Sequence, residues 1–83
     1  MKKQKILQKI LNNPNNVRFL EVKSVVEGFG FKLSRVSGSH HIFTHPETKE
    51  IVNLQNVNGQ AKSYQVKQFL KLVERYDLEL KEK

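Results

Sequence analysis

The chain has 83 residues, with 15 Lys and Arg against 8 Asp and Glu, a formal net charge of +7 and no cysteine. This length allows one small domain with a modest core, and no apolar run is long enough to span a membrane. The lack of cysteine excludes disulfides, thiol nucleophiles and sulfur-ligated metal sites, and is compatible with a cytoplasmic location. The positive charge suggests a polyanionic partner, although a merely solubilising surface has the same composition.

A short basic helix is expected over residues 2–11, with apolar side chains on one side and lysines elsewhere. The run Asn12-Asn13-Pro14-Asn15-Asn16 ends it, because proline and asparagine favour turns and caps. We expect residues 1–13 to form an N-terminal helical appendage that packs on the edge of the domain. A basic arm that touches nucleic acid is the alternative interpretation.

A second helix is expected over about residues 20–28, and we assign it to the core. Its apolar residues form one stripe at positions i, i+3, i+6, i+7 and i+10. They are Phe19, Val22, Val25, Val26 and Phe29. Gly28 and Gly30 are placed to end the helix, since glycine adopts the left-handed conformation in which helices often end.

Three strands are expected next, over residues 31–36, 39–45 and 51–54. The turn-rich residues 46–49 join the second and third strands into a hairpin, so the sheet is antiparallel. Residues 56–60 are expected to form a polar loop.

Ser63 is a plausible N-cap for a last helix over about residues 64–75, which carries a second apolar stripe. Leu78 and Leu80 are expected to pack back on the domain, and residues 81–83 to be frayed. The order α-β-β-β-α predicts a small two-layer α+β domain over residues 17–80. In it, two helices cover one face of a three-stranded antiparallel sheet.

All three histidines lie in one predicted strand, at His40, His41 and His45. Side chains alternate between the two faces of a strand. If Phe43 points to the core, His41 and His45 share its face, and His40 points the other way. His40 is therefore the histidine expected to meet a molecule outside the protein.

The run Gly38-Ser39-His40-His41-Ile42-Phe43, followed by His45-Pro46 in this βββ setting, resembles the HicA-type (YcfA-like) toxins of toxin–antitoxin systems. The pair Gly30-Phe31, the third strand and the closing helix extend the resemblance over about residues 17–80. It implies a fold like a double-stranded-RNA-binding domain. It also implies an mRNA interferase that cleaves RNA without a metal or other cofactor, and a HicB-type antitoxin that masks the active site. The family's catalytic histidine follows Gly-Ser, and so corresponds to His40.

RNA cleavage without a metal needs a base for the ribose 2′-OH, an acid for the departing 5′-oxygen, and donors for the charge of the phosphorane. His40 is the candidate base or acid, and the neighbouring His41 is the alternative. Candidate RNA contacts lie in the turn, on the strands and at the start of the last helix, where a helix N-terminus attracts phosphate. They are Ser39, His41, Arg35, Lys62, Tyr64 and Lys67.

Other functions compete with this hypothesis. A metal site is not expected, because His40 and His41 point to opposite faces of a strand and Glu47 is the only carboxylate nearby. A non-catalytic RNA-binding module would need the basic surface but not His40. A protein-interaction module would use the charge to bind an acidic partner.

Overall fold

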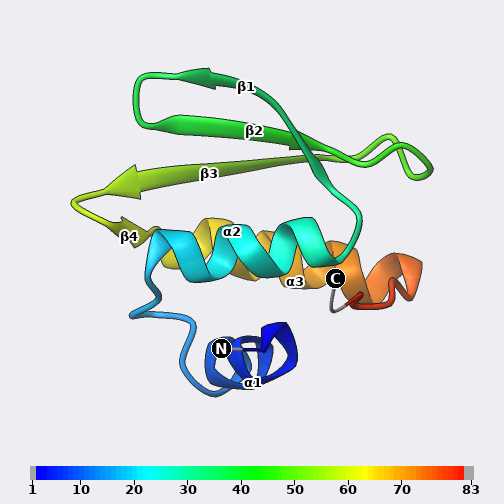
Figure 1. Cartoon of the computed structure of the whole chain (residues 1–83), viewed down its shortest axis with the longest axis horizontal. Coiled ribbons are helices and arrows are strands. Elements are labelled where there is room, and N and C mark those ends of the chain that lie inside the picture. The colour runs from blue at the N-terminus through cyan, green and yellow to red at the C-terminus, as the bar shows by residue number, and fades with distance from the viewer. Residues whose placement is uncertain (1, 82–83) are drawn as a thin grey trace.

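The computed structural model describes residues 2–81. The elements are α1 (Lys3–Asn12), α2 (Phe19–Gly28), β1 (Lys32–Ser37), β2 (His40–Thr44), β3 (Ile51–Val57), β4 (Gln60–Ala61) and α3 (Ser63–Tyr76). The strands form one antiparallel sheet in the order β1-β2-β3-β4, and α2 and α3 lie on one face of it (Figure 1). This arrangement confirms the expected small α+β fold of the double-stranded-RNA-binding type.

The sheet has four strands in the described residues, so the expectation of three strands and a polar loop over residues 56–60 is wrong. Asn58 and Gly59 form a two-residue turn with φ values of 53° and 86°. Two successive positive φ values are typical of tight hairpins, for which Asn-Gly is the preferred pair. The Asn56 side-chain Oδ1 accepts the Gly59 N–H at 2.8 Å and closes the turn. The returning strand β4 has only two residues, which is too short to show alternation in the sequence.

The last helix begins one residue earlier than predicted. The N–H of Val66 donates to the carbonyl of Lys62, at 3.1 Å, so Lys62 is the N-cap and Ser63 is already helical. No side chain caps this end of α3, and the prediction of Ser63 as the capping residue is therefore wrong.

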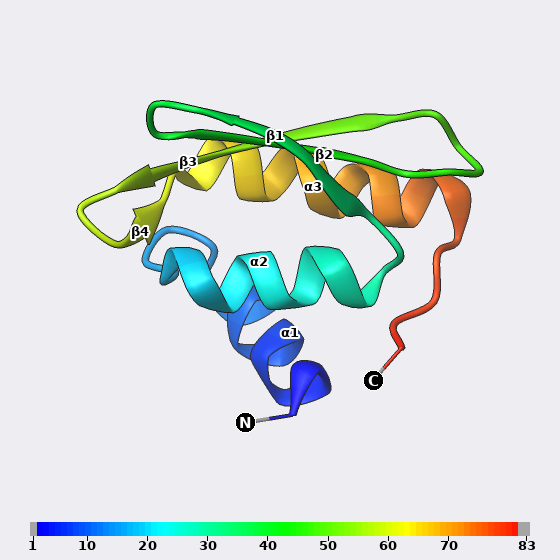
Figure 2. The same cartoon turned by 45° about the horizontal axis from the view of Figure 1, so that its top comes forward.

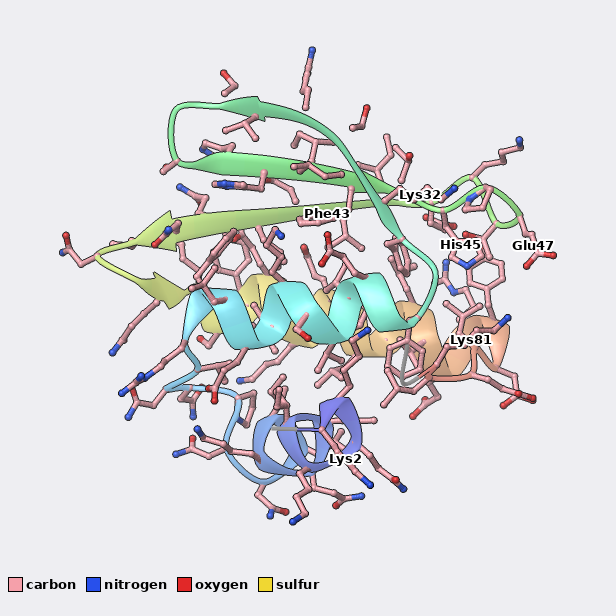
Figure 3. The ribbon with its side chains drawn as sticks, viewed as in Figure 1. Lys2, Lys32, Phe43, His45, Glu47 and Lys81 are labelled. Carbon is pink, nitrogen blue, oxygen red and sulfur yellow. The ribbon has the colours of Figure 1, made fainter. Side chains whose placement is uncertain are left out.

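The core lies between the sheet and the two helices, as the two apolar stripes predict. Phe31, Phe43 and Phe69 are each at most 1% exposed. The Phe69 ring packs edge-on against Phe29 and Phe31, with centroid distances of 5.7 and 5.9 Å. Figure 3 shows Phe43 reaching from β2 into the layer between sheet and helices.

Helix α1 lies on the side of α2 that faces away from the sheet (Figures 1 and 2). Ile6 and Ile10 are buried there, and Lys9 forms an ion pair with Glu21 of α2 at 3.0 Å. The buried apolar side chains provide most of this contact, since an exposed ion pair contributes at most about 1 kcal/mol.

The chain after α3 returns to the end of α2. Asp77 adopts the left-handed conformation at the helix C-terminus, with φ of 50°. The N–H of Lys81 donates to the carbonyl of Gly28 at 2.8 Å. Lys81 is thus held in place, contrary to the expectation of a frayed tail over residues 81–83. Residues 82 and 83 lie outside the described part of the chain.

Tyr76 links the end of α3 to the start of β3. Its hydroxyl makes the stability of the fold decrease at alkaline pH. Its hydroxyl donates to Glu50 Oε2 at 2.5 Å. This hydrogen bond, with smaller effects of desolvation and of the Glu50 charge, raises the pKa of Tyr76 above its ordinary value of 10.0. The bond's contribution to stability is therefore complete below pH 10.0 and is lost as the pH rises through the folded-state pKa.

We expect Tyr76→Phe to lose less stability than the wild type as the pH rises above 10.0, because it has no hydroxyl to ionise. Urea unfolding across this range measures the difference, and lysine deprotonation contributes equally to both proteins. Parallel pH profiles would contradict the expectation.

Candidate functional site around His40

His40 lies at one end of the molecule, where several chain segments meet. It is the first residue of β2, directly after the β1–β2 turn. The β3–β4 turn and the N-termini of α2 and α3 lie at the same end (Figures 1 and 2). A helix N-terminus carries a partial positive charge, so α2 and α3 add positive potential to this end of the molecule.

The side chain of His40 points to the face of the sheet that the helices leave open. Phe43 is fully buried on the helix side, whereas the His40 ring contacts Asn53, whose neighbours Val52 and Leu54 are buried, so His40 lies on the opposite face, as predicted. His40 Nδ1 lies 3.1 Å from Oδ1 of Asn53, on the neighbouring strand. An amide oxygen only accepts, so Nδ1 carries the hydrogen. Among residues 2–81, Nε2 has no hydrogen-bond partner.

His41 points to the helices, as predicted. Its ring centroid lies 4.5 Å from that of Phe19, the first residue of α2. Its Nδ1 lies 3.2 Å from the carbonyl oxygen of Ser39, so Nδ1–H is the donor. The same carbonyl accepts the N–H of Asn56 at 2.9 Å. His41 therefore packs α2 against the turn that precedes His40.

His45 lies at the opposite end of the molecule, next to the β2–β3 turn (Figure 3). It is buried, and its Nδ1 accepts the N–H groups of Glu47 and Thr48, each at 3.2 Å. Its ring packs edge-on against Phe31, with a centroid distance of 5.0 Å. His45 thus organises the turn, in agreement with its interpretation as a strand-end residue.

The start of α3 is tied to the strand that pairs with His40. Gln55 pairs with His40 across β2 and β3. The hydroxyl of Tyr64 donates to Gln55 Oε1 at 3.4 Å. The buried Gln65 accepts the backbone N–H of Gln55 through Oε1 at 2.7 Å and donates to Gln55 Oε1 at 3.1 Å. Lys62, the exposed N-cap of α3, is therefore held at the same end as His40.

The remaining predicted RNA contacts are Ser39, Arg35 and Lys67, which lie on three different elements of the chain. Ser39 occupies the turn before His40 and is exposed. Arg35 is exposed and pairs with Ile42, which places it on the same open face as His40. Lys67 is exposed on α3, three residues after Tyr64, and so on a neighbouring part of the helix surface. The structure thus brings Ser39, Tyr64 and Lys62 to the end that carries His40, with Arg35 and Lys67 further from it.

Sequence reasoning missed three residues at this site: Asn53, Gln55 and Gln65. The first two lie on β3: Asn53 shares the face of His40, Gln55 pairs with His40 and reaches α3 with its side chain, and a correct β2–β3 register identifies both. Gln65 directly precedes Val66, which belongs to the apolar stripe of α3. The hydrophobic periodicity of the helix does not indicate that Gln65 is buried. A polar side chain at the margin of a stripe is a weak signal.

Among the carboxylates of the described residues, Glu21 in the first turn of α2 lies at the end that carries His40, and the rest lie away from it. Glu21 and Glu27 on α2 pair with Lys9 and Lys23, at 3.0 and 3.5 Å. The others occupy the β2–β3 turn, the C-terminal end of α3 and the chain that follows it. They are Glu47, Glu50, Glu74, Asp77 and Glu79. The end that carries His40, Arg18 and Lys62 is thus suited to an anion.

Comparison with protein families gives a match to the family described as HicA toxin of bacterial toxin–antitoxin, over residues 20–74, about two thirds of the chain. The chain belongs to the HicA toxin family. No curated protein and no solved structure matches it. Membership makes the chain a toxin of a toxin–antitoxin system and implies an antitoxin partner.

The HicA match includes His40, Asn53 and the first turns of α3, and leaves α1 outside. None of the helices within residues 2–81 has the length and apolarity needed to cross a membrane. In the same part of the chain, no three His, Asp or Glu side chains are grouped in a way that could hold a metal ion.

Proposed function

We propose that this HicA toxin is an mRNA interferase, a metal-independent endoribonuclease that cleaves single-stranded RNA in the cytoplasm and arrests translation. The observation that carries the proposal is the position of His40. Its ring lies on an open face at the cationic end of the molecule, with Nδ1–H engaged and Nε2 available. A neutral imidazole held in this way can accept a proton at Nε2.

In the proposed reaction, His40 Nε2 takes the proton of a ribose 2′-OH, and the 2′-oxygen attacks the adjacent phosphorus. The bond from phosphorus to the 5′-oxygen breaks, and this oxygen receives a proton from water or from a second acid. The products are a 2′,3′-cyclic phosphate and a 5′-OH end. The positive potential at this end of the molecule, from the Lys62 ammonium and the N-termini of α2 and α3, favours the negative charge that develops on the non-bridging oxygens of the phosphorane.

The RNA contacts follow from the same geometry. Lys62, Lys67 and Arg35 would neutralise phosphates on either side of the scissile bond. The exposed Tyr64 ring would stack on an unpaired base, which favours single-stranded RNA. Ser39 would donate to a phosphate oxygen from the turn, and His41 would support that turn from the helix side.

The antitoxin partner is proposed to be of the HicB type and to cover the end that carries His40. Such a partner would bind the cations used for RNA and would exclude the substrate directly. An acidic surface on the antitoxin fits the Arg18 and Lys62 region.

Induced expression in bacteria without the antitoxin tests the proposal. We expect the wild-type chain to stop growth and degrade cellular mRNA, and an equally abundant, folded His40→Ala variant to do neither. Growth rate, RNA integrity and protein level are measured together. Normal growth and intact RNA with a folded wild-type chain would refute the nuclease function and favour a non-catalytic RNA-binding module.

A further inference from the structure

We propose that Asn53 is the positioning residue of His40, and that it fixes which imidazole nitrogen is available for chemistry. Asn53 lies in the middle of β3, where it pairs with Ile42, two residues from His40 on β2. Its side chain projects from the same open face, and the contact between Oδ1 and His40 Nδ1 at 3.1 Å bridges the two strands. The role of this contact in catalysis rests on the proposed function, whereas its effect on the ring does not.

The side chain of a histidine on an open strand face has two degrees of freedom, the rotation of its ring and its tautomeric state. A single acceptor at Nδ1 restricts both, because it requires the hydrogen on Nδ1 and turns Nε2 away from Asn53. In a neutral imidazole this leaves the lone pair on Nε2. General-base catalysis needs that lone pair within hydrogen-bond reach of the substrate hydroxyl.

The chemistry of Asn53 also suits an anionic substrate. A carboxylate in its place would accept the same hydrogen bond, but would repel the phosphodiester at the site of cleavage. An amide orients the ring without adding negative charge to the cationic end of the molecule. Asn53 is exposed, and its backbone is already held in the β2–β3 ladder, so we expect replacement of its side chain to leave the fold intact.

The experiment compares wild type, Asn53→Leu and Asn53→Asp, with Asn16→Leu as the control at an exposed linker position. Long-range ¹H–¹⁵N NMR of the imidazole nitrogens, at about pH 8.5 where an ordinary imidazole is neutral, reports the His40 tautomer without any need for activity. Steady-state cleavage of a single-stranded RNA gives kcat, KM and the pH–rate profile. Thermal unfolding confirms that each variant is folded.

We expect the Nδ1–H tautomer at His40 in the wild type, Asn16→Leu and Asn53→Asp, and a mixture with the Nε2–H tautomer in Asn53→Leu. We expect Asn53→Leu to lower kcat by roughly 10- to 100-fold with little change in KM. Asn53→Asp should keep the orientation and move the acidic limb of the pH–rate profile to higher pH, because a carboxylate favours the protonated ring.

An unchanged tautomer together with wild-type kcat in folded Asn53→Leu would overturn the positioning role. A second outcome is that the wild type shows the Nδ1–H tautomer, that Asn53→Leu loses it, and that the wild type cleaves no RNA. This outcome would refute the nuclease function but would preserve the effect of Asn53 on the His40 ring. The two proposals therefore fail separately.

Discussion

Replacing His40 with alanine is expected to lower the rate of RNA cleavage by roughly 10²- to 10⁴-fold, the usual contribution of a general acid or base. The imidazole lies on the open face and packs in no part of the core, so its removal should leave the fold intact. Single-turnover cleavage of a single-stranded RNA in the presence of a chelator measures the effect. The chelator also tests whether the reaction needs a metal.

His41→Ala is the matched control, because it removes an identical ring from the adjacent position. Its ring faces α2 and contacts Phe19, so the variant should lose stability but keep cleavage within about tenfold of wild type. Circular dichroism and urea unfolding separate the two effects. If folded His41→Ala loses cleavage and His40→Ala retains it, the catalytic role belongs to His41.

Phe69→Ala is expected to have the largest effect on stability, lowering the free energy of unfolding by about 3–5 kcal/mol. Phe69 is fully buried on α3, and its ring contacts those of Phe29 and Phe31, so alanine leaves a cavity between helix and sheet. Small domains have a total stability of only about 5–15 kcal/mol. The midpoint of thermal unfolding should therefore fall by roughly 12–40 °C.

Leu20→Ala provides the control for Phe69→Ala. Leu20 is 74% exposed on α2, and its truncation should change the free energy of unfolding by about 0.5 kcal/mol or less. Urea unfolding of both variants tests the comparison. A Phe69→Ala variant as stable as Leu20→Ala would contradict the assignment of Phe69 to the centre of the core.

Much of the site could be predicted because its main features are local. The position of His40 on the open face follows from its odd spacing from Phe43, once Phe43 is assigned to the core. The same alternation places His41 against the helices. The helix stripes likewise predict that Phe69 and Val26 are buried, since the 3.6-residue period depends only on neighbouring residues.

The pairing of β4 with β3 was not predicted, because the composition of this segment points the other way. Residues 56–60 are polar, and polar composition favours a loop, but Asn58-Gly59 favours a tight turn more strongly. The short β4 is stabilised by pairing with the end of β3 and by contact with the chain before α2, where Ala61 N–H donates to the Val17 carbonyl. These partners are distant in sequence, and no local pattern indicates them.

The alternation of β2, the two buried helix faces, the net positive charge and the Gly-Ser-His run can all be read from the amino-acid sequence. The contact of Asn53 with His40 and the link from Gln65 to Gln55 become evident only in the folded chain. The same is true of the position of both helix N-termini at the end that carries His40. Periodicity specifies which face a side chain occupies, whereas the residue opposite it depends on strand register and helix docking, which are set by contacts between segments far apart in the chain.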